Sequence, residues 1–345
     1  MKIINILLAI FFSIVIVACG GGASVSSSNS SVLVQSIPLY AQGLNGNKNI
    51  IVAAYSDNTN SGSTSGFRET LNIYQQDAAN PDLLLNLGSV YLGVDTLYKR
   101  LADITLNAEW AAVTINFNDA AQGWVALVPM VGPTYSLSAT IPFNVTLDRA
   151  VAMGNWLLVA SNTNITLYDI TVPSSPVLNS TFVLSASTTS MVALANGFLV
   201  ITDNGYGYID VTNPASVTFT ETANSDIKQS QKAYLIGNKI YIGGPSKYAG
   251  KAKIARVDVT TPSAPTVDIV NDQISGTFVD FSYDSVDGYY LQFIDSVQLY
   301  KESSGVLTLN KSASLSSYSN AASQLHAYNG RFYIGKWSMD IYRMP

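Results

Sequence analysis

Short apolar runs with strand character alternate with polar turns along most of the chain. Residues 156–160 (WLLVA) form one such run, and residues 165–168 (ITLY) alternate apolar and polar positions. A Gly-Asn pair precedes the first run, and a Ser-Asn-Thr-Asn segment separates the two runs. Gly, Asn and Ser clusters bound strands and favour turns. The pattern predicts short β-strands joined by tight connections.

The second of these strands leads into the segment Asp-Ile-Thr-Val-Pro at 169–173. Proline cannot donate to a sheet ladder, so the strand must end there, and the Asp and Thr side chains favour a turn. Strand patterns also fit residues 150–153 and 177–183. Four short strands within roughly 40 residues have the size and content of one propeller blade.

The same turn recurs along the chain. Clear copies lie at 210–214 (DVTNP) and 258–262 (DVTTP), a weaker copy lies at 77–81, and the copy at 129–133 lacks the Asp. With two further units placed by spacing, the unit ends fall at residues 81, 133, 173, 214, 262, 305 and 345. We therefore predict an all-β propeller, seven four-stranded blades with six or eight as alternatives, and very little helix.

The last unit stops where the other units continue into an outer strand. Residues 32–36 (VLVQS) resemble the outer strand at 176–180 (PVLNS). We expect 32–36 to supply the missing outer strand of the last blade, because this closes the ring without an open sheet edge between the first and last blades.

The repeated unit resembles the LVIVD repeats of a family of bacterial propellers. Those repeats pair a Gly-x-x-Tyr-Val-Ala-like strand with a Val-Asp-Val-Ser/Thr-Asn-Pro-like turn, as in residues 197–201 (GFLVI) and 210–214 here. The resemblance covers residues 151–265 well and the rest loosely. It implies a propeller fold and exposure at the cell surface, but no single activity.

The first residues look like a lipoprotein signal. Met1 and Lys2 precede an apolar run at 3–17, which is about as long as a signal-peptide core and short for a membrane span. The run ends in Ile-Val-Ala-Cys-Gly, which resembles the bacterial lipobox, and Cys19 is the only cysteine. The alternative is an ordinary signal peptide or an anchor helix. We expect cleavage before Cys19 and lipidation of its thiol.

These features divide the chain into a signal peptide (1–18), a tether rich in Gly and Ser (19–31) and the propeller (32–345). The residue after Cys19 is Gly rather than Asp. By resemblance to Gram-negative lipoproteins, this implies the outer membrane, although a Gram-positive surface lipoprotein would carry the same box. The expected partners are the membrane, through the lipid, and an unknown protein or glycan of the cell envelope.

The composition and charge of the chain predict a large core and exclude one class of function. The chain is 48% hydrophobic, which is ample for a large core, and only 12% of its residues are charged. Removal of Lys2 with the signal peptide would leave 17 basic and 23 acidic side chains. This balance argues against nucleic-acid binding, which needs a clustered basic face.

Residues for catalysis are scarce. The single histidine, His326, lies in an alternating strand pattern, and we interpret it as a hydrogen-bonded strand residue rather than a catalytic base. Zinc needs three or four ligands, usually His or Cys, which this chain cannot supply. We predict no cofactor, with calcium as the alternative, held in the channel by acids near the inner ends of blades. The candidate ligands are Asp103, Asp148, Asp280 and Asp284.

Aromatic and basic residues in the predicted connections between second and third strands suggest a recognition face, since Tyr, Trp and Arg are common interface anchors. The alternative is that these rings simply cover blade edges. The candidate residues are Phe67, Arg68, Tyr206, Lys247, Tyr248 and Trp337, with no catalytic residue among them.

Three functions follow as hypotheses. The first is a lipid-anchored, non-enzymatic binding module for a protein or glycan. The second is a propeller hydrolase or lactonase that depends on a divalent metal. The third is a scaffold for outer-membrane assembly, which is an analogy by fold alone.

Overall fold

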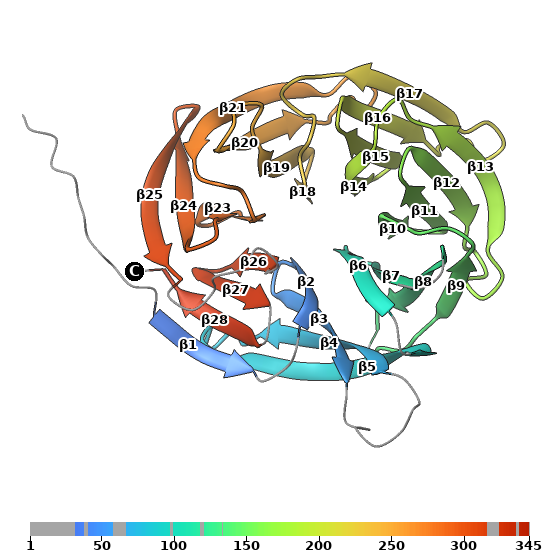
Figure 1. Cartoon of the computed structure of the whole chain (residues 1–345), viewed down its shortest axis with the longest axis horizontal. Helices are drawn as coiled ribbons and strands as arrows, with labels where there is room; N and C mark the ends of the chain where they lie inside the picture. Colours follow the sequence, from blue (N-terminus) through green and yellow to red (C-terminus); the bar gives the residue numbers. More distant parts are fainter. Residues whose placement is uncertain are drawn as a thin grey trace, which may run out of the picture.

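Seven four-stranded antiparallel sheets surround a central channel (Figure 1). The computed structural model describes residues 32–37, 41–57, 67–96, 99–117, 121–132, 134–315, 324–335 and 338–344. These residues form strands and turns and contain no helix. The predicted seven-bladed, all-β propeller is confirmed, and the alternatives of six or eight blades are wrong.

Each blade runs from an inner strand at the channel to an outer strand at the rim. Blade 1 contains β2 (Ala41–Asn47), β3 (Ile50–Asp57), β4 (Phe67–Gln76) and β5 (Leu84–Thr96). Blade 2 contains β6 (Lys99–Leu106), β7 (Trp110–Phe117), β8 (Gly123–Pro129) and β9 (Ala139–Phe143). Blade 3 contains β10 (Arg149–Met153), β11 (Trp156–Ser161), β12 (Asn164–Asp169) and β13 (Val177–Val183).

The remaining blades follow the same order. Blade 4 contains β14 (Thr188–Leu194), β15 (Gly197–Thr202), β16 (Gly205–Asp210) and β17 (Thr218–Ala223). Blade 5 contains β18 (Lys232–Ile236), β19 (Lys239–Pro245), β20 (Lys251–Asp258) and β21 (Thr266–Ser275). Blade 6 contains β22 (Asp280–Asp284), β23 (Gly288–Gln292), β24 (Ser296–Ser303) and β25 (Val306–Ser314). Blade 7 contains β26 (Gln324–Tyr328), β27 (Arg331–Gly335), β28 (Met339–Arg343) and β1 (Val32–Ile37).

The outer strand of blade 7 comes from the other end of the chain, as predicted. Strand β1 pairs antiparallel with β28, with Val32 opposite Arg343 and Ile37 opposite Met339. The Ser36 hydroxyl donates to the Asp340 carboxylate at 2.5 Å. This pairing joins segments about 300 residues apart and removes an open edge at the seam of the ring.

The hydrophobic core is divided into seven clusters, one in each gap between neighbouring blades. The seam between blades 7 and 1 buries Leu44, Tyr333, Met339 and Ile341, and Ile37 of β1 packs against them. Because each blade is apolar on both faces, the sheets stack around the channel instead of forming a sandwich. Every blade therefore depends on two neighbours.

Glycine at the start of a blade's second strand has a steric role. A Cβ atom on Gly197 would lie 2.0 Å from the carbonyl oxygen of Ile209 on the adjacent strand. No real side chain tolerates that approach, so the close pairing of β15 with β16 requires glycine at this position.

The recurring Asp-x-Thr turn is an Asx turn in every clear copy. The Asp169 carboxylate accepts hydrogen bonds from the backbone N–H and the hydroxyl of Thr171. Asp210 and Asp258 accept the backbone N–H of Thr212 and Thr260 in the same way. Each carboxylate closes its own turn after the third strand of its blade, so the repeated acids do not form a shared cluster.

Candidate functional site

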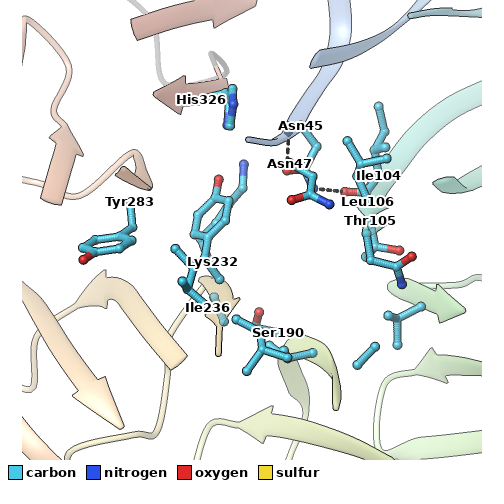
Figure 2. A pocket seen from close by; sticks show the side chains of 18 of the residues that line it. Asn45, Asn47, Ile104, Thr105, Leu106, Ser190, Lys232, Ile236, Tyr283 and His326 are labelled. Atoms are coloured by element: carbon cyan, nitrogen blue, oxygen red, sulfur yellow. Dashed lines mark hydrogen bonds between the residues drawn. The ribbon is translucent and has the colours of Figure 1, made fainter. Parts of the chain in front are cut away.

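The central channel contains a cavity of about 510 Å³. All seven inner strands contribute to its wall, and it extends to the hairpins that join first and second strands. Figure 2 shows polar side chains from several blades around this space, including Asn45, Asn47, Lys232 and His326. Its volume lies within the ~300–1,000 Å³ that is usual for small-molecule sites.

The wall of the channel is held by hydrogen bonds from the side chains of one inner strand to the backbone of the next. An inner strand is a sheet edge, so its unpaired N–H and C=O groups need partners. Asp280, Ser282 and Asp284 on β22 accept the backbone N–H groups of alternate residues on β26 and its hairpin. On the other side, Thr105 and Asn107 donate to carbonyl oxygens of β10 at 2.6 Å. These contacts fix the inner strands around the cavity.

Lys232 is the central charge of the site. Its ammonium lies 3.0 Å from the Asp280 carboxylate, and the two side chains are only 16% and 9% exposed. Burial alone would lower the pKa of Lys232, but the carboxylate of Asp280, with Tyr234 and Asp103 nearby, raises it above its usual value. The ammonium therefore stays charged at neutral pH.

A second ion pair lies on the opposite side of the channel. Arg149 of β10 contacts Asp103 of β6 at 3.0 Å. Each ion pair joins the inner strands of two neighbouring blades. The two cations and the two carboxylates contribute no net charge at the channel.

His326 lies on inner strand β26, as predicted, and is only 2% exposed. Its Nε2 lies 3.1 Å from the carbonyl oxygen of Lys48, which can only accept, so Nε2 carries the proton. Nδ1 has no hydrogen-bond partner within the described residues. The imidazole ring packs so closely on Gly46 that a Cβ atom there would lie 2.3 Å from it.

Burial lowers the pKa of His326 to about 4, and the charge of Lys232 acts in the same direction. Between about pH 6.5 and pH 4, His326 is protonated in the unfolded chain but stays neutral in the folded protein. The free energy of unfolding should therefore fall as the pH drops from about 6.5 to about 4, by about 3 kcal/mol in total. Urea denaturation at pH 7 and pH 5 should record about 2 kcal/mol of this loss.

His326→Gln is the matched variant for this pH effect, because its amide can still donate to the Lys48 carbonyl and does not titrate. The pH 7 to pH 5 loss should be smaller in this variant than in the unaltered protein. Since His326 is the only histidine, equal losses in the two proteins would contradict the assignment.

The four acids considered for calcium do not come together. Asp280 and Asp103 pair with basic side chains, and Asp148 accepts the backbone N–H of Asn162. Asp284 is buried, which raises its pKa, and it accepts backbone N–H groups. Among the residues that the structure describes, no group of three or more His, Cys, Asp or Glu side chains is placed to hold a metal ion.

Six residues were predicted to form a recognition face. Within the described residues, two of them, Lys247 and Tyr248, lie on an exposed connection. Lys247 and Tyr248 occupy the connection between β19 and β20, where both are exposed. The Lys247 ammonium lies 5.3 Å from the Tyr248 ring centroid and 3.3 Å from the Asp272 carboxylate. This connection leaves the second strand of its blade at the end opposite to the first-to-second hairpins that line the cavity.

Tyr206 does not belong to that face, and its assignment to an open connection is wrong. The connection after β15 is only Asp203-Asn204, so the next strand resumes at Gly205. Strand alternation then directs Tyr206 into the core between blades 4 and 5, where it is 4% exposed.

Several predicted residues fall outside the described part of the molecule. Trp337 and Cys19, together with the predicted signal peptide and tether at 1–31, are among them. Phe67 and Arg68 begin β4, but their side chains also lie outside the described residues. Within the described residues, no helix is long and apolar enough to cross a membrane.

Sequence reasoning missed the basic members of the channel ion pairs, although a signal was present. Arg149 follows Asp103 by 46 residues, and Asp280 follows Lys232 by 48. Both separations fall within the 40–52-residue spacing of the repeat. Opposite charges one repeat apart on inner strands would have predicted that neighbouring blades bring them together.

The fold and the lined channel define a seven-bladed β-propeller with a central cavity. Similar solved structures include a chain of the mitotic checkpoint complex, with a TM-score of 0.59 and 11% identity, covering 92% of this chain and 94% of that chain. The periplasmic gluconolactonase of Pseudomonas aeruginosa has a TM-score of 0.55 and 12% identity, covering 82% and 87% of the two chains.

The WD40 domain of Toxoplasma gondii coronin is also similar, with a TM-score of 0.53 and 13% identity, covering 91% of this chain and 85% of that chain. At these identities the likeness concerns the fold alone. No protein-family model matches the chain. No curated protein sequence matches it either.

Proposed function

We propose that this protein is a lipid-anchored binding protein of the bacterial cell envelope, an LVIVD-type propeller at the outer membrane, that acts without catalysis. Its ligand is a small, uncharged polar group, such as one or two sugar residues at the end of a glycan. The observation that carries the proposal is the 510 Å³ channel cavity, at which Lys232 and Arg149 are already paired with Asp280 and Asp103.

The chemistry of the wall supports an uncharged ligand. An anion would have to compete with Asp280 for the Lys232 ammonium, and a cation would have to displace Arg149 from Asp103. An uncharged hydroxyl group needs neither exchange. It can accept one of the ammonium N–H groups of Lys232 that Asp280 does not occupy.

The ion pairs also support binding rather than metal-assisted hydrolysis. Asp103 and Asp280 would have to leave their basic partners before they could hold a divalent cation. The neutral His326, with a pKa of about 4, is bonded through Nε2 to the Lys48 carbonyl. In this arrangement the side chains of the channel are set to hold a ligand by hydrogen bonds.

A binding screen with a blocked variant tests the proposal. Uncharged mono- and oligosaccharides should bind the purified protein saturably in isothermal titration calorimetry, and no substrate should be consumed. Ile236→Trp should abolish binding, because Ile236 lines the cavity and is 40% exposed, so a larger ring occludes the mouth without burial in the core.

Val286→Trp is the matched control. Val286 lies on the hairpin of the neighbouring blade and is 72% exposed, but it does not line the cavity. Binding should survive this substitution. Saccharide binding that resists Ile236→Trp, or turnover that is lost in chelator, would contradict the proposal.

A further inference from the structure

The start of the outer strand of blade 1, with the residue that precedes it, exposes a row of leucines at the rim. Leu83, Leu85 and Leu87 are 44%, 47% and 38% exposed, whereas Leu84 between them packs against the core at the seam. Leu33 on the adjoining strand β1 is 52% exposed. These four leucines are called the leucine strip below.

The two parts of the strip lie on either side of the seam between blades 7 and 1, where ion pairs join the two blades. Asp82, immediately before Leu83, forms ion pairs with both Arg331 and Arg343 of blade 7. Arg343 is in turn opposite Val32 in the pairing of β1 with β28. Strands β1 and β5 accordingly follow one another along the same part of the ring's outer edge (Figure 1).

The proposed lipid anchor joins the propeller at this part of the rim. Residues 19–31 connect Cys19 to Val32, the first residue of β1. Thirteen residues span at most about 45 Å when fully extended. A lipid on Cys19 therefore holds the start of β1 within about 45 Å of the bilayer.

The strip is also free of charge along the sequence. No Asp, Glu, Lys or Arg occurs between Leu83 and Val94, nor between Cys19 and Asn47. The charged groups beside the strip are Asp82, Arg331 and Arg343, which pair with one another at the seam. Contact with the boundary between headgroups and acyl chains would therefore bury no unpaired charge from these segments, and burial of an unpaired charge is costly. Tyr91, 42% exposed on β5, is a residue type that favours that boundary.

We infer that the leucine strip rests on the lipid bilayer surface, so that the propeller stands on the rim of blades 7 and 1. This inference relies on the lipid anchor of the proposed function. In this orientation the channel axis lies along the membrane plane, because the strip is on the outer edge of the ring. Both channel openings then stay accessible to a ligand.

Blade 3 supplies a matched comparison. Its outer strand β13 exposes Leu178 by 58%, which is more than any leucine of the strip, but it lies on the far right of the ring in Figure 1. If exposed leucine alone decided which edge meets the membrane, the β13 edge and the leucine strip would be equivalent. Only the position of the anchor distinguishes them.

Fluorescence quenching on the full, lipidated protein tests the inference. Leu85→Cys and Leu178→Cys variants are labelled with an environment-sensitive dye and reconstituted into phosphatidylcholine liposomes that contain brominated acyl chains. Because the strip would sit ~5–10 Å into the boundary region, the dye at 85 should shift to the blue and lose at least about half of its intensity. The dye at 178 should match its signal in unbrominated liposomes.

The outcomes separate this inference from the anchor itself. Mass spectrometry of Cys19 and flotation with liposomes report the lipid directly. Flotation with equal quenching at 85 and 178, or with no quenching at 85, overturns the rim orientation and leaves the anchor intact. An unmodified Cys19 without flotation overturns both.

Discussion

Removal of residues 1–37 should lower the melting temperature by about 10 °C or more, or prevent folding, because it deletes the outer strand of the closing blade. The loss includes the backbone hydrogen bonds of β1 to β28, each worth about 0.5–1.5 kcal/mol, and the packing of Ile37 against the seam cluster. Together these losses lower the free energy of unfolding by about 5 kcal/mol. Each kcal/mol lowers the melting temperature by about 2–4 °C, which gives the expected shift.

The control for this truncation is removal of residues 1–31. It takes away the predicted signal peptide and tether but retains Val32–Ile37. Its melting temperature should equal that of the longer chain. Thermal unfolding followed by circular dichroism measures both variants, and equal melting temperatures for the two truncations would show that β1 does not hold the ring closed.

Lys232→Met should lower the free energy of unfolding by about 3 kcal/mol, because it leaves the buried carboxylate of Asp280 without its cation. Asp280 would still accept the backbone N–H of Leu325, which limits the loss. Urea denaturation at pH 7 measures the change.

The double variant Lys232→Met/Asp280→Asn tests the cause. Asparagine keeps a carbonyl oxygen for the Leu325 N–H but carries no charge, so the double variant should be more stable than Lys232→Met alone. Strictly additive losses from the two substitutions would mean that the ion pair does not couple blades 5 and 6.

The blade architecture could be predicted because its signals are local. An Asp-x-Thr-x-Pro turn such as 210–214 bonds within itself and ends a strand, wherever the rest of the chain lies. The pairing of β1 with β28 could also be predicted, because a missing outer strand at one end of the chain matched a spare strand at the other.

The site was harder to predict because its contacts cross between blades. Asp103 and Asp280 were candidates, but their basic partners lie one repeat away and were not recognised. Tyr206 was misplaced because a two-residue connection leaves it inside a strand, whereas the longer connection at Tyr248 does expose its ring. Whether an aromatic residue reaches a loop thus depended on where each strand begins.

Closure of the ring by β1 positions the seam, the channel and the proposed anchor point, and a disulfide between residues 36 and 340 tests this closure most directly. Ser36 and Asp340 contact each other through their side chains, and a Cys19→Ser background contains no other cysteine. After oxidation of the Ser36→Cys/Asp340→Cys variant, peptide mapping should find the two positions linked within one molecule, with a raised melting temperature. Free thiols at both positions, or links only between molecules, would contradict the closed seven-bladed ring.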